Sequence, residues 1–229
     1  MEYRIENKYL VSELEIAAIS QRLKTVMQPD VHQEGAHYEI RSIYFDDIYD
    51  SGFLDNENGV NDRKKYRIRS YGPAPSAINL EIKEKMNALT RKTKCGLDQD
   101  EYAGLLEDAC LMPFGQKAPL NELLLHARTR RLKPCALIVY ERTAFVHPVG
   151  NVRITFDKNI MATSDFETFR DARVEGLIPV LPAGMHILEV KYDELLPDFI
   201  AKQLEIRTLQ QTAFSKFYYG RCALAGSLY

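Results

Sequence analysis

The sequence lacks the net positive charge that would point to a protein that binds nucleic acid over its whole surface. Its 30 Lys and Arg side chains are outnumbered by 32 Asp and Glu side chains, which gives a formal net charge of −2. A global basic field is therefore absent. Any site for an anion must come from local clustering of cationic side chains.

Cysteines are also few, and long apolar runs are missing. The 229 residues include four cysteines and no C-x-x-C pair, so neither a zinc motif nor a redox motif is indicated. No apolar run approaches 18 residues, and the amino-terminal run MEYRIENKYLV has no apolar core of a signal peptide. We therefore expect a reduced, soluble, cytoplasmic protein with no membrane span in this chain.

Motifs for binding nucleotide phosphates are absent as well. The sequence contains neither G-x-x-x-x-G-K-[ST] nor G-x-G-x-x-G, which excludes a P-loop or a Rossmann-type phosphate site. It has no internal repeat, linker or shift in composition that marks a domain boundary. Because 45% of the residues are hydrophobic, we expect residues 1–229 to form a single domain with a substantial core.

Hydrophobic periodicity predicts strands with helices between them. Strands are expected at 3–11, 37–47, 64–71, 77–87, 89–97, 135–146, 151–163 and 185–194. Helices are expected at 12–27, 98–108, 120–131, 197–209 and 214–228, the first of them opening with a Ser12–Glu15 capping box. Hairpin spacing favours antiparallel pairing, and sheets of about eight strands tend to close or to split into two layers.

The run KYRIRSYG places arginines at alternating positions of one predicted strand. With a period of two, Lys65, Arg67 and Arg69 share one face, and Tyr66 and Ile68 share the other. A solvated outer face is the ordinary explanation for one such strand. Repeated over several strands, however, these cations would repel one another unless an anion lay among them.

The same division into a charged and an apolar face recurs in other predicted strands. Their charged faces hold Arg4, Glu6 and Lys8; Glu81, Lys83 and Lys85; Tyr140 and Arg142; Arg153, Thr155 and Asp157; and Glu189 and Lys191. Charges inside a barrel and helices outside it would satisfy both faces. We therefore predict an α+β fold with an eight-stranded antiparallel β-barrel and helices packed outside it.

Arginine and lysine in such a barrel would suit phosphate groups. Carboxylates beside them would be useful if a divalent cation, Mn²⁺ or Mg²⁺, bridged carboxylate and phosphate. Glu189 is the first candidate ligand, with Glu81 and Glu6 as further candidates, and the chemistry indicated is phosphoryl transfer. Nucleic acid is a poorer candidate, since the basic face is internal and no aromatic series interleaves with it.

Eight motifs follow one another between residues 3 and 222: RIENKYLV, IRSIYFDD, KYRIRSYG, NLEIKEKMNALTRKTK, YERTAF, VRITFD, LEVKY and FSKFYYG. In this order they resemble the VTC domain, the polyphosphate polymerase domain of the vacuolar transporter chaperone complex. That domain belongs with the triphosphate tunnel metalloenzymes, also called the CYTH-like superfamily. The resemblance implies an eight-stranded tunnel lined with basic side chains and a divalent metal held by glutamate.

The resemblance also implies roles for residues at matching motif positions. It implies catalytic, phosphate-binding roles for Arg67, Arg69, Lys83, Arg142, Arg153 and Lys216, and substrate-binding roles for Lys8, Lys85 and Lys191. It implies that Glu189 is the metal ligand. Arg4 occupies the position of the first acid in the superfamily's E-x-E-x-K pattern. This difference weakens the interpretation as a two-metal triphosphatase or a cyclase, and it agrees with the VTC branch.

Three functions fit this pattern. The first is a polyphosphate polymerase that moves the γ-phosphate of ATP onto a polyphosphate chain. The second is a triphosphatase or polyphosphatase acting in the same tunnel, and the third is a non-catalytic module that senses polyphosphate. In the eukaryotic complex the domain is joined to membrane helices, so a membrane partner protein is expected if the polymer is exported. The oligomeric state is left open.

Overall fold

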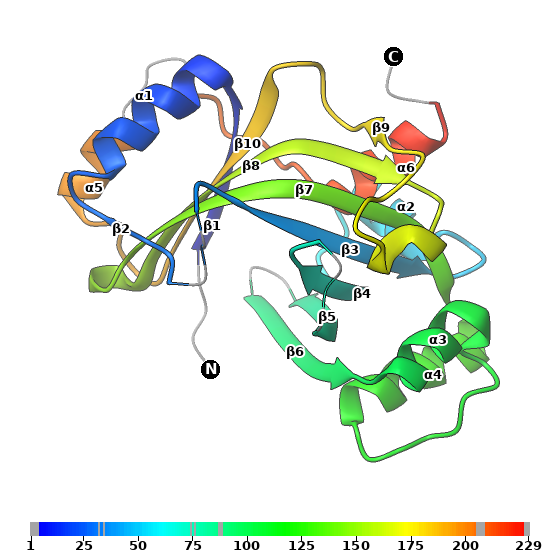
Figure 1. Ribbon diagram of the computed structural model, residues 1–229. Helices are drawn as coiled ribbons and strands as arrows, with labels where there is room; N and C mark the ends of the chain where they lie inside the picture. Colours follow the sequence, from blue (N-terminus) through cyan, green and yellow to red (C-terminus); the bar gives the residue numbers. More distant parts are fainter. Residues whose placement is uncertain are drawn as a thin grey trace. The chain divides into compact units, whose positions relative to one another are not determined.

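The computed structural model describes residues 5–226 except 32, 34, 74, 76, 87, 88 and 205–208. It is an α+β structure with a ten-stranded sheet (Figure 1). The strands are β1 (Ile5–Ser12), β2 (Gln28–Pro29), β3 (Tyr38–Asp46), β4 (Arg63–Tyr71), β5 (Ile78–Met86), β6 (Leu89–Leu97), β7 (Lys133–His147), β8 (Val152–Thr163), β9 (Ile178–Pro179) and β10 (Met185–Tyr192). The helices are α1 (Glu13–Leu23), α2 (Ser51–Glu57), α3 (Gln99–Asp108), α4 (Ala118–Arg130), α5 (Asp198–Leu204) and α6 (Lys216–Leu224).

The eight long strands follow the predicted ones, and their order in the sheet is β1-β10-β8-β7-β3-β4-β5-β6. Two short strands were not predicted: β2 pairs with β7, and β9 pairs with β8. Each has two residues, too few to produce a periodic signal. The amino-terminal residues of the first predicted strand, including Arg4, lie outside the described residues, as do 205–208 and 227–228 of the predicted carboxy-terminal helices.

The prediction of a closed eight-stranded barrel is not confirmed. The strand order has two ends: β1 pairs with β10 and β6 pairs with β5. Closure would require hydrogen bonds along the second edge of both end strands, and no such pairing occurs in the described part of the sheet. The alternation of side chains predicts which face of a strand is polar, but it does not fix how the end strands meet.

The chain divides into two compact units, and each is described by itself. Unit 1 comprises Met1–Glu39, Tyr140–Ile160 and Leu181–Phe214, and unit 2 comprises Ile40–Val139, Met161–Val180 and Ser215–Tyr229. Three of the boundaries fall within β3, β7 and β8, and each unit is built from three separate segments.

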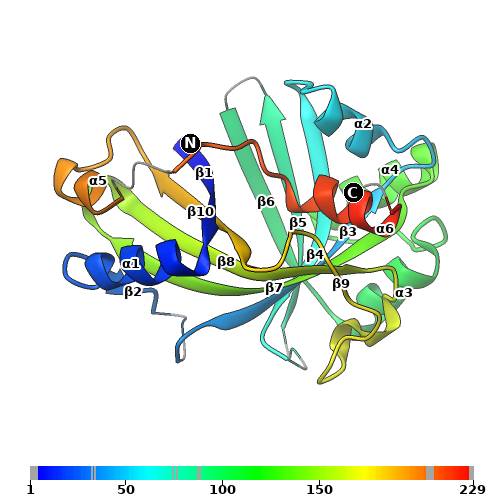
Figure 2. The same ribbon diagram turned by 90° about the horizontal axis from the view of Figure 1, so that it is seen from above.

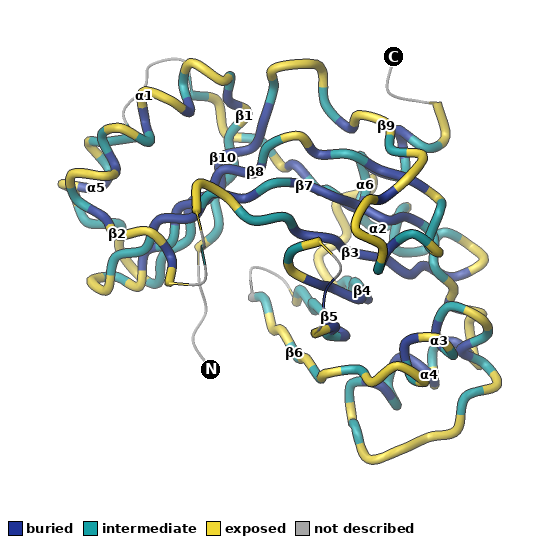
Figure 3. The backbone as a smooth tube through the Cα atoms, viewed as in Figure 1, coloured by how far each residue is buried: buried dark blue, intermediate teal, exposed yellow. Residues whose placement is uncertain are grey.

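The core of unit 1 lies between its strands and α1. Ile16, Ile19 and Leu23 form the buried face of α1, at the spacing of one helix face. They pack in one cluster with apolar side chains of β8 and β10, and α5 lies beside α1 (Figures 1 and 3). The predicted capping box is present, because the Ser12 backbone N–H donates to Glu15 Oε2 at 2.7 Å and the Glu15 N–H donates to Ser12 Oγ at 3.3 Å.

The core of unit 2 lies between β4–β6 and the helices α3 and α4 (Figure 2). Tyr66 and Ile68 are 5% and 0% exposed and join a cluster that includes Leu105 of α3 and Leu123 of α4. The prediction that these two strand residues point under covering helices is confirmed. The longest helix, α4, has 13 residues, and no described helix is long and apolar enough to cross a membrane.

Helix α6 contacts β7 closely enough to require glycine. A Cβ atom added at Gly220 would lie 2.2 Å from Ile138 Cδ1. The helix begins after Ser215, whose Oγ accepts a hydrogen bond from the Tyr218 backbone N–H at 3.3 Å. This packing fixes the start of α6, and with it the position of Lys216.

Candidate active site: two polar strand faces

The first polar face belongs to unit 1 and is called the carboxylate face below. It consists of Glu6, Lys8, Arg142, Arg153, Thr155, Asp157, Glu189 and Lys191. Strand register aligns these residues, since Glu6 pairs with Lys191 and Lys8 pairs with Glu189 between β1 and β10. Directly paired residues of antiparallel strands share one side of the sheet.

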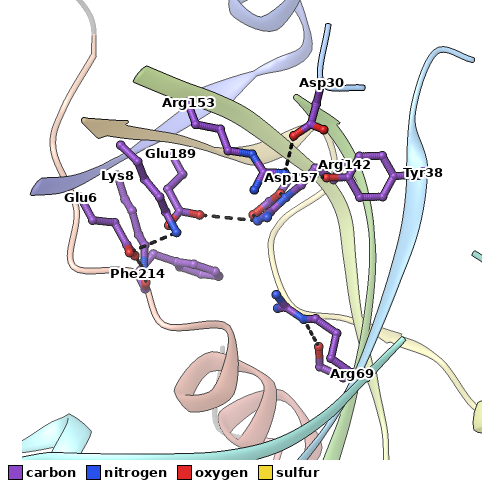
Figure 4. Close-up of polar contacts among 12 residues, drawn as sticks. Glu6, Lys8, Asp30, Tyr38, Arg69, Arg142, Arg153, Asp157, Glu189 and Phe214 are labelled. Atoms are coloured by element: carbon purple, nitrogen blue, oxygen red, sulfur yellow. Dashed lines mark hydrogen bonds and ion pairs between the residues drawn. The ribbon is translucent and has the colours of Figure 1, made fainter. Parts of the chain in front are cut away.

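Two carboxylates of this face share one ammonium group. Lys191 Nζ lies 2.9 Å from Glu189 Oε1 and 3.3 Å from Glu6 Oε2. Lys8 Nζ lies 3.1 Å from Glu6 Oε1 and donates a hydrogen bond to the Phe214 carbonyl at 2.9 Å (Figure 4). The structure thus brings Glu6, Glu189, Lys8 and Lys191 together, as one group of alternating charges.

Arg142 is held by an acid that we did not predict as a site residue. Its Nε and Nη2 donate to the two carboxylate oxygens of Asp157 at 2.6 and 2.7 Å, and its Nη2 lies 3.5 Å from Glu189 Oε2 (Figure 4). Asp157 is fully buried and Arg142 is 8% exposed. Burial alone would lower the pKa of Arg142, but Asp157 raises it well above its ordinary value, so this arginine is a fixed cation.

Arg153 also has a carboxylate partner from a distant part of the sequence. Its Nη2 lies 2.8 Å from Asp30 Oδ2 and donates to the Tyr38 hydroxyl at 3.2 Å (Figure 4). Asp30 is 8% exposed. Arg142 and Arg153 are therefore both oriented by an acid, which leaves the carboxylate face with cations and anions in close pairs.

The donor atoms of this face fit a hard divalent cation. Glu6 and Glu189 both lie within ion-pair distance of the Lys191 ammonium, so two carboxylates already converge on one positive charge. No group of three or more His, Cys, Asp or Glu side chains that could hold a metal occurs in the described part of the chain. Magnesium commonly uses one or two carboxylates and completes its shell with water and substrate phosphates.

The second polar face belongs to unit 2 and is called the basic face below. It consists of Arg63, Lys65, Arg67, Arg69, Glu81, Lys83, Lys85, Lys92 and Lys94. Register places Lys65, Lys83 and Lys92 in one row across β4, β5 and β6, and Arg67, Glu81 and Lys94 in the next row. The predicted charged face of KYRIRSYG is therefore extended by two further strands.

Glu81 is the carboxylate around which this face is arranged. Its Oε2 accepts from Arg67 Nε and Nη2 at 2.9 and 2.6 Å, it lies 3.7 Å from Arg69 Nη1, and Glu81 also pairs with Lys92. Burial would raise the pKa of Glu81, but Arg67, Arg69 and Lys92 lower it to about 2. Because several cations already hold this carboxylate, it fits a divalent metal less well than Glu189 does.

The cations of the basic face lower the pKa of the Tyr44 hydroxyl. Burial would raise the pKa of its hydroxyl, yet the nearby Arg67, Arg69 and Lys216 bring that pKa below its ordinary value. The hydroxyl accepts a hydrogen bond from Arg67 Nη1 at 3.1 Å, and the Tyr44 ring packs 5.3 Å from that of Phe217. Lys216, the first residue of α6, is therefore close enough to act on the same face.

The strand register of β4, β5 and β6 gives the positions of the remaining lysines of the basic face. Lys83 lies between Lys65 and Lys92, and Lys85 pairs with Arg63, the first residue of β4. Lys65 is fixed by hydrogen bonds to Asn56 Oδ1 at 2.7 Å and to Ser215 Oγ at 2.8 Å. Lys92 and Lys94 were not predicted, although their alternation in LTRKTKCGL was a signal that could have found them.

Comparison with known proteins places the chain in a family. The model of the VTC domain matches residues 3–225, nearly the whole sequence. The chain belongs to the VTC domain family. The resemblance of its eight motifs to this domain is therefore confirmed. No curated protein matches the chain.

Several solved structures are similar to this VTC domain, and the one with a TM-score above 0.5 shares its fold. A candidate adenylate cyclase from Bacillus halodurans is 16% identical with a TM-score of 0.51, and the alignment covers 89% of this chain and 87% of that one. A candidate adenylate cyclase from Vibrio parahaemolyticus is 14% identical with a TM-score of 0.47, covering 99% and 88%. A protein from Pyrococcus horikoshii is 16% identical with a TM-score of 0.45, covering 89% and 85%.

Proposed function

We propose that this VTC domain is a metal-dependent phosphotransferase that moves the γ-phosphate of ATP onto a polyphosphate chain. The basic face is the observation that carries the proposal. Arg67 and Arg69 lie on β4, lysines of the same face lie on β5 and β6, and the two arginines share the carboxylate of Glu81. Guanidinium groups held this way present forked donors that match phosphate oxygens.

In this proposal the basic face binds the phosphate chain. Arg67, Arg69, Lys83 and Lys216 would contact its oxygens, and Lys85 would extend the contact toward the end of β5. On the carboxylate face, Arg142 and Arg153 would contribute fixed guanidinium groups, and Lys8 and Lys191 would contribute ammonium groups. Phosphoryl transfer depends mainly on such positioning and charge neutralisation.

Glu189 would hold the divalent metal, with Glu6 as a second ligand. The proposal is supported by the ion pairs that both carboxylates make with the Lys191 ammonium. A bound Mn²⁺ or Mg²⁺ would neutralise charge on phosphate oxygens. No general base is required, because a terminal phosphate of the acceptor is already ionised near neutral pH.

The direct test is incubation of the purified protein with ATP and Mn²⁺, followed by measurement of ADP and of polyphosphate. We expect both products, and we expect Arg69→Ala to lose most of the activity while remaining folded by circular dichroism. Arg91→Ala is the matched control, because Arg91 is half exposed and pairs with Glu84 rather than with Glu81. If the wild-type protein forms neither ADP nor polyphosphate, the proposal is contradicted.

The same assay separates the other functions of a triphosphate-binding domain. Orthophosphate released from tripolyphosphate, without chain growth from ATP, would indicate a hydrolase. Tight binding of tripolyphosphate without turnover under Mn²⁺ or Mg²⁺ would indicate a sensor. Each of these results would replace the polymerase proposal.

A further inference from the structure

Thr155 is a buried polar residue whose hydroxyl makes no hydrogen bond within the described structure. The residue is 2% exposed, and its Oγ1 atom has no partner. It lies on β8 between Arg153 and Asp157 on the carboxylate face, directly across from Glu189 of β10. A hydroxyl removed from water without a partner destabilises the fold.

Other threonines of the chain show that this hydroxyl is unusual. Thr143 Oγ1 donates to the Ala36 carbonyl at 3.0 Å, and Thr129 Oγ1 donates to the Leu125 carbonyl at 2.8 Å. Thr163, which is buried like Thr155, accepts from the Asp165 backbone N–H at 3.0 Å. A β-branched side chain suits a strand, but valine would give the same shape without an orphaned hydroxyl.

The surroundings of Thr155 indicate which ligand would satisfy it. Its neighbours at alternating positions on β8 are Arg153, which carries a guanidinium, and Asp157, which fixes Arg142. The Thr155 hydroxyl can donate one hydrogen bond, and a phosphate oxygen near these two arginines would accept it.

We propose that Thr155 is a ligand-contacting residue whose hydroxyl donates a hydrogen bond to an oxygen of the bound phosphate chain. This inference rests on the proposed function, because it assumes that triphosphate or polyphosphate binds this domain. The Thr155 hydroxyl would add a neutral hydrogen bond to the contacts that the charged side chains make with the phosphate chain. The orphaned hydroxyl is thus explained as one that is satisfied when the ligand binds.

The test compares Thr155→Val, Thr155→Ser and the wild-type protein in two measurements. The first is thermal unfolding without ligand, where Thr155→Val should be as stable as the wild type or more stable, because it removes an unsatisfied hydroxyl. The second is calorimetric binding of tripolyphosphate with Mn²⁺ present, where Thr155→Val should raise Kd by about tenfold or more. Thr155→Ser keeps the hydroxyl and should bind much as the wild type does.

Ser70→Ala is the matched control. Ser70 is also fully buried with an unpartnered hydroxyl, but it alternates with Tyr66 and Ile68 on the opposite side of β4 from Arg67 and Arg69. Its removal should leave the Kd for tripolyphosphate unchanged. Titration with Mn²⁺ alone distinguishes a phosphate contact from a contact to the metal or its water, since Thr155→Val should leave Mn²⁺ affinity unchanged.

Three results would overturn the inference. One is a Thr155→Val protein that is less stable without ligand and binds tripolyphosphate like the wild type, which would mean that the hydroxyl serves the fold. Another is a loss of affinity for Mn²⁺ alone, which would assign the hydroxyl to the metal. A wild-type protein that does not bind tripolyphosphate would remove the proposed function as well, whereas the first two results leave it standing.

Discussion

The carboxylate face and the basic face differ in how their cations are balanced. On the carboxylate face each cation has a nearby acid, in the pairs Lys8–Glu6, Lys191–Glu189, Arg142–Asp157 and Arg153–Asp30. On the basic face Arg67, Arg69 and Lys92 all lie around Glu81. The first face is close to neutral, and the second carries an excess of positive charge.

The difference in charge balance determines which kind of ligand each face favours. On the near-neutral carboxylate face, a metal cation can take the place of the Lys191 ammonium between Glu6 and Glu189 with little change in charge. A face with excess positive charge gains most from an anion with several charges, such as a phosphate chain. We therefore expect the metal to bind on the carboxylate face and most of the phosphate chain to bind on the basic face.

The largest effect is expected from breaking a pair on the carboxylate face. Asp157→Asn would leave the buried Arg142 guanidinium without its counter-charge, and breaking such buried pairs costs about 3–5 kcal/mol of the free energy of unfolding. Urea denaturation measures this change. Asp100→Asn, at an exposed position in the first turn of α3, is the control and should change stability by less than about 0.5 kcal/mol. Similar stabilities for the two variants would contradict the pairing.

The next effect concerns the carboxylate of the basic face. Glu81 has a pKa of about 2 in the folded protein, below its ordinary value of 4.5. A lowered folded-state pKa stabilises the protein above pH 4.5, and this stabilisation is lost as the pH falls toward 2. Its size at neutral pH is roughly 3 kcal/mol.

Glu81→Gln should therefore destabilise the protein at pH 7 and much less at pH 3, as measured by denaturation at both pH values. It should also tighten binding of tripolyphosphate at low ionic strength, because the basic face loses its acid. Equal destabilisation at the two pH values would contradict the role of ionised Glu81. Weaker binding would contradict the view that the excess positive charge of this face drives anion affinity.

A smaller effect is expected at the margin of the basic face. The Lys92 side chain is 45% exposed, so water screens its charge. Lys92→Met should weaken tripolyphosphate binding by up to about fivefold, and the difference should shrink as salt is added. Arg91→Met removes a charge from the adjacent residue on the opposite side of β6 and should have no such effect. Equal losses for both variants would mean that only net charge matters.

The sequence was sufficient to predict which residues share a face. Alternation alone placed Arg67 and Arg69 opposite Tyr66 and Ile68, and the structure confirms this division. It was not sufficient to find Asp30 as the partner of Arg153, because the two residues lie far apart along the chain. Such pairs depend on tertiary contacts, which no local pattern contains.

Helix α2 was missed for a local reason. Its seven residues, SGFLDNE, bury no side chain, so they produce no apolar face of helical period. The helix follows Asp50, whose φ of 54° is in the left-handed region that favours glycine, and its side chain makes no capping hydrogen bond. The backbone N–H groups of Gly52 and Phe53 donate to the Asp46 carboxylate at 2.9 and 3.0 Å, and these hydrogen bonds, with packing against α6 and β4, account for this helix.

The most direct test of the division between the two faces is calorimetric titration of two variants with two ligands. Glu189→Gln should lose most of its affinity for Mn²⁺ while it binds tripolyphosphate in the absence of metal nearly as the wild type does. Arg69→Ala should show the reverse, with Mn²⁺ binding retained and tripolyphosphate binding weakened about tenfold or more. If each variant lost both ligands to the same extent, the assignment of metal to the carboxylate face and phosphate to the basic face would be wrong.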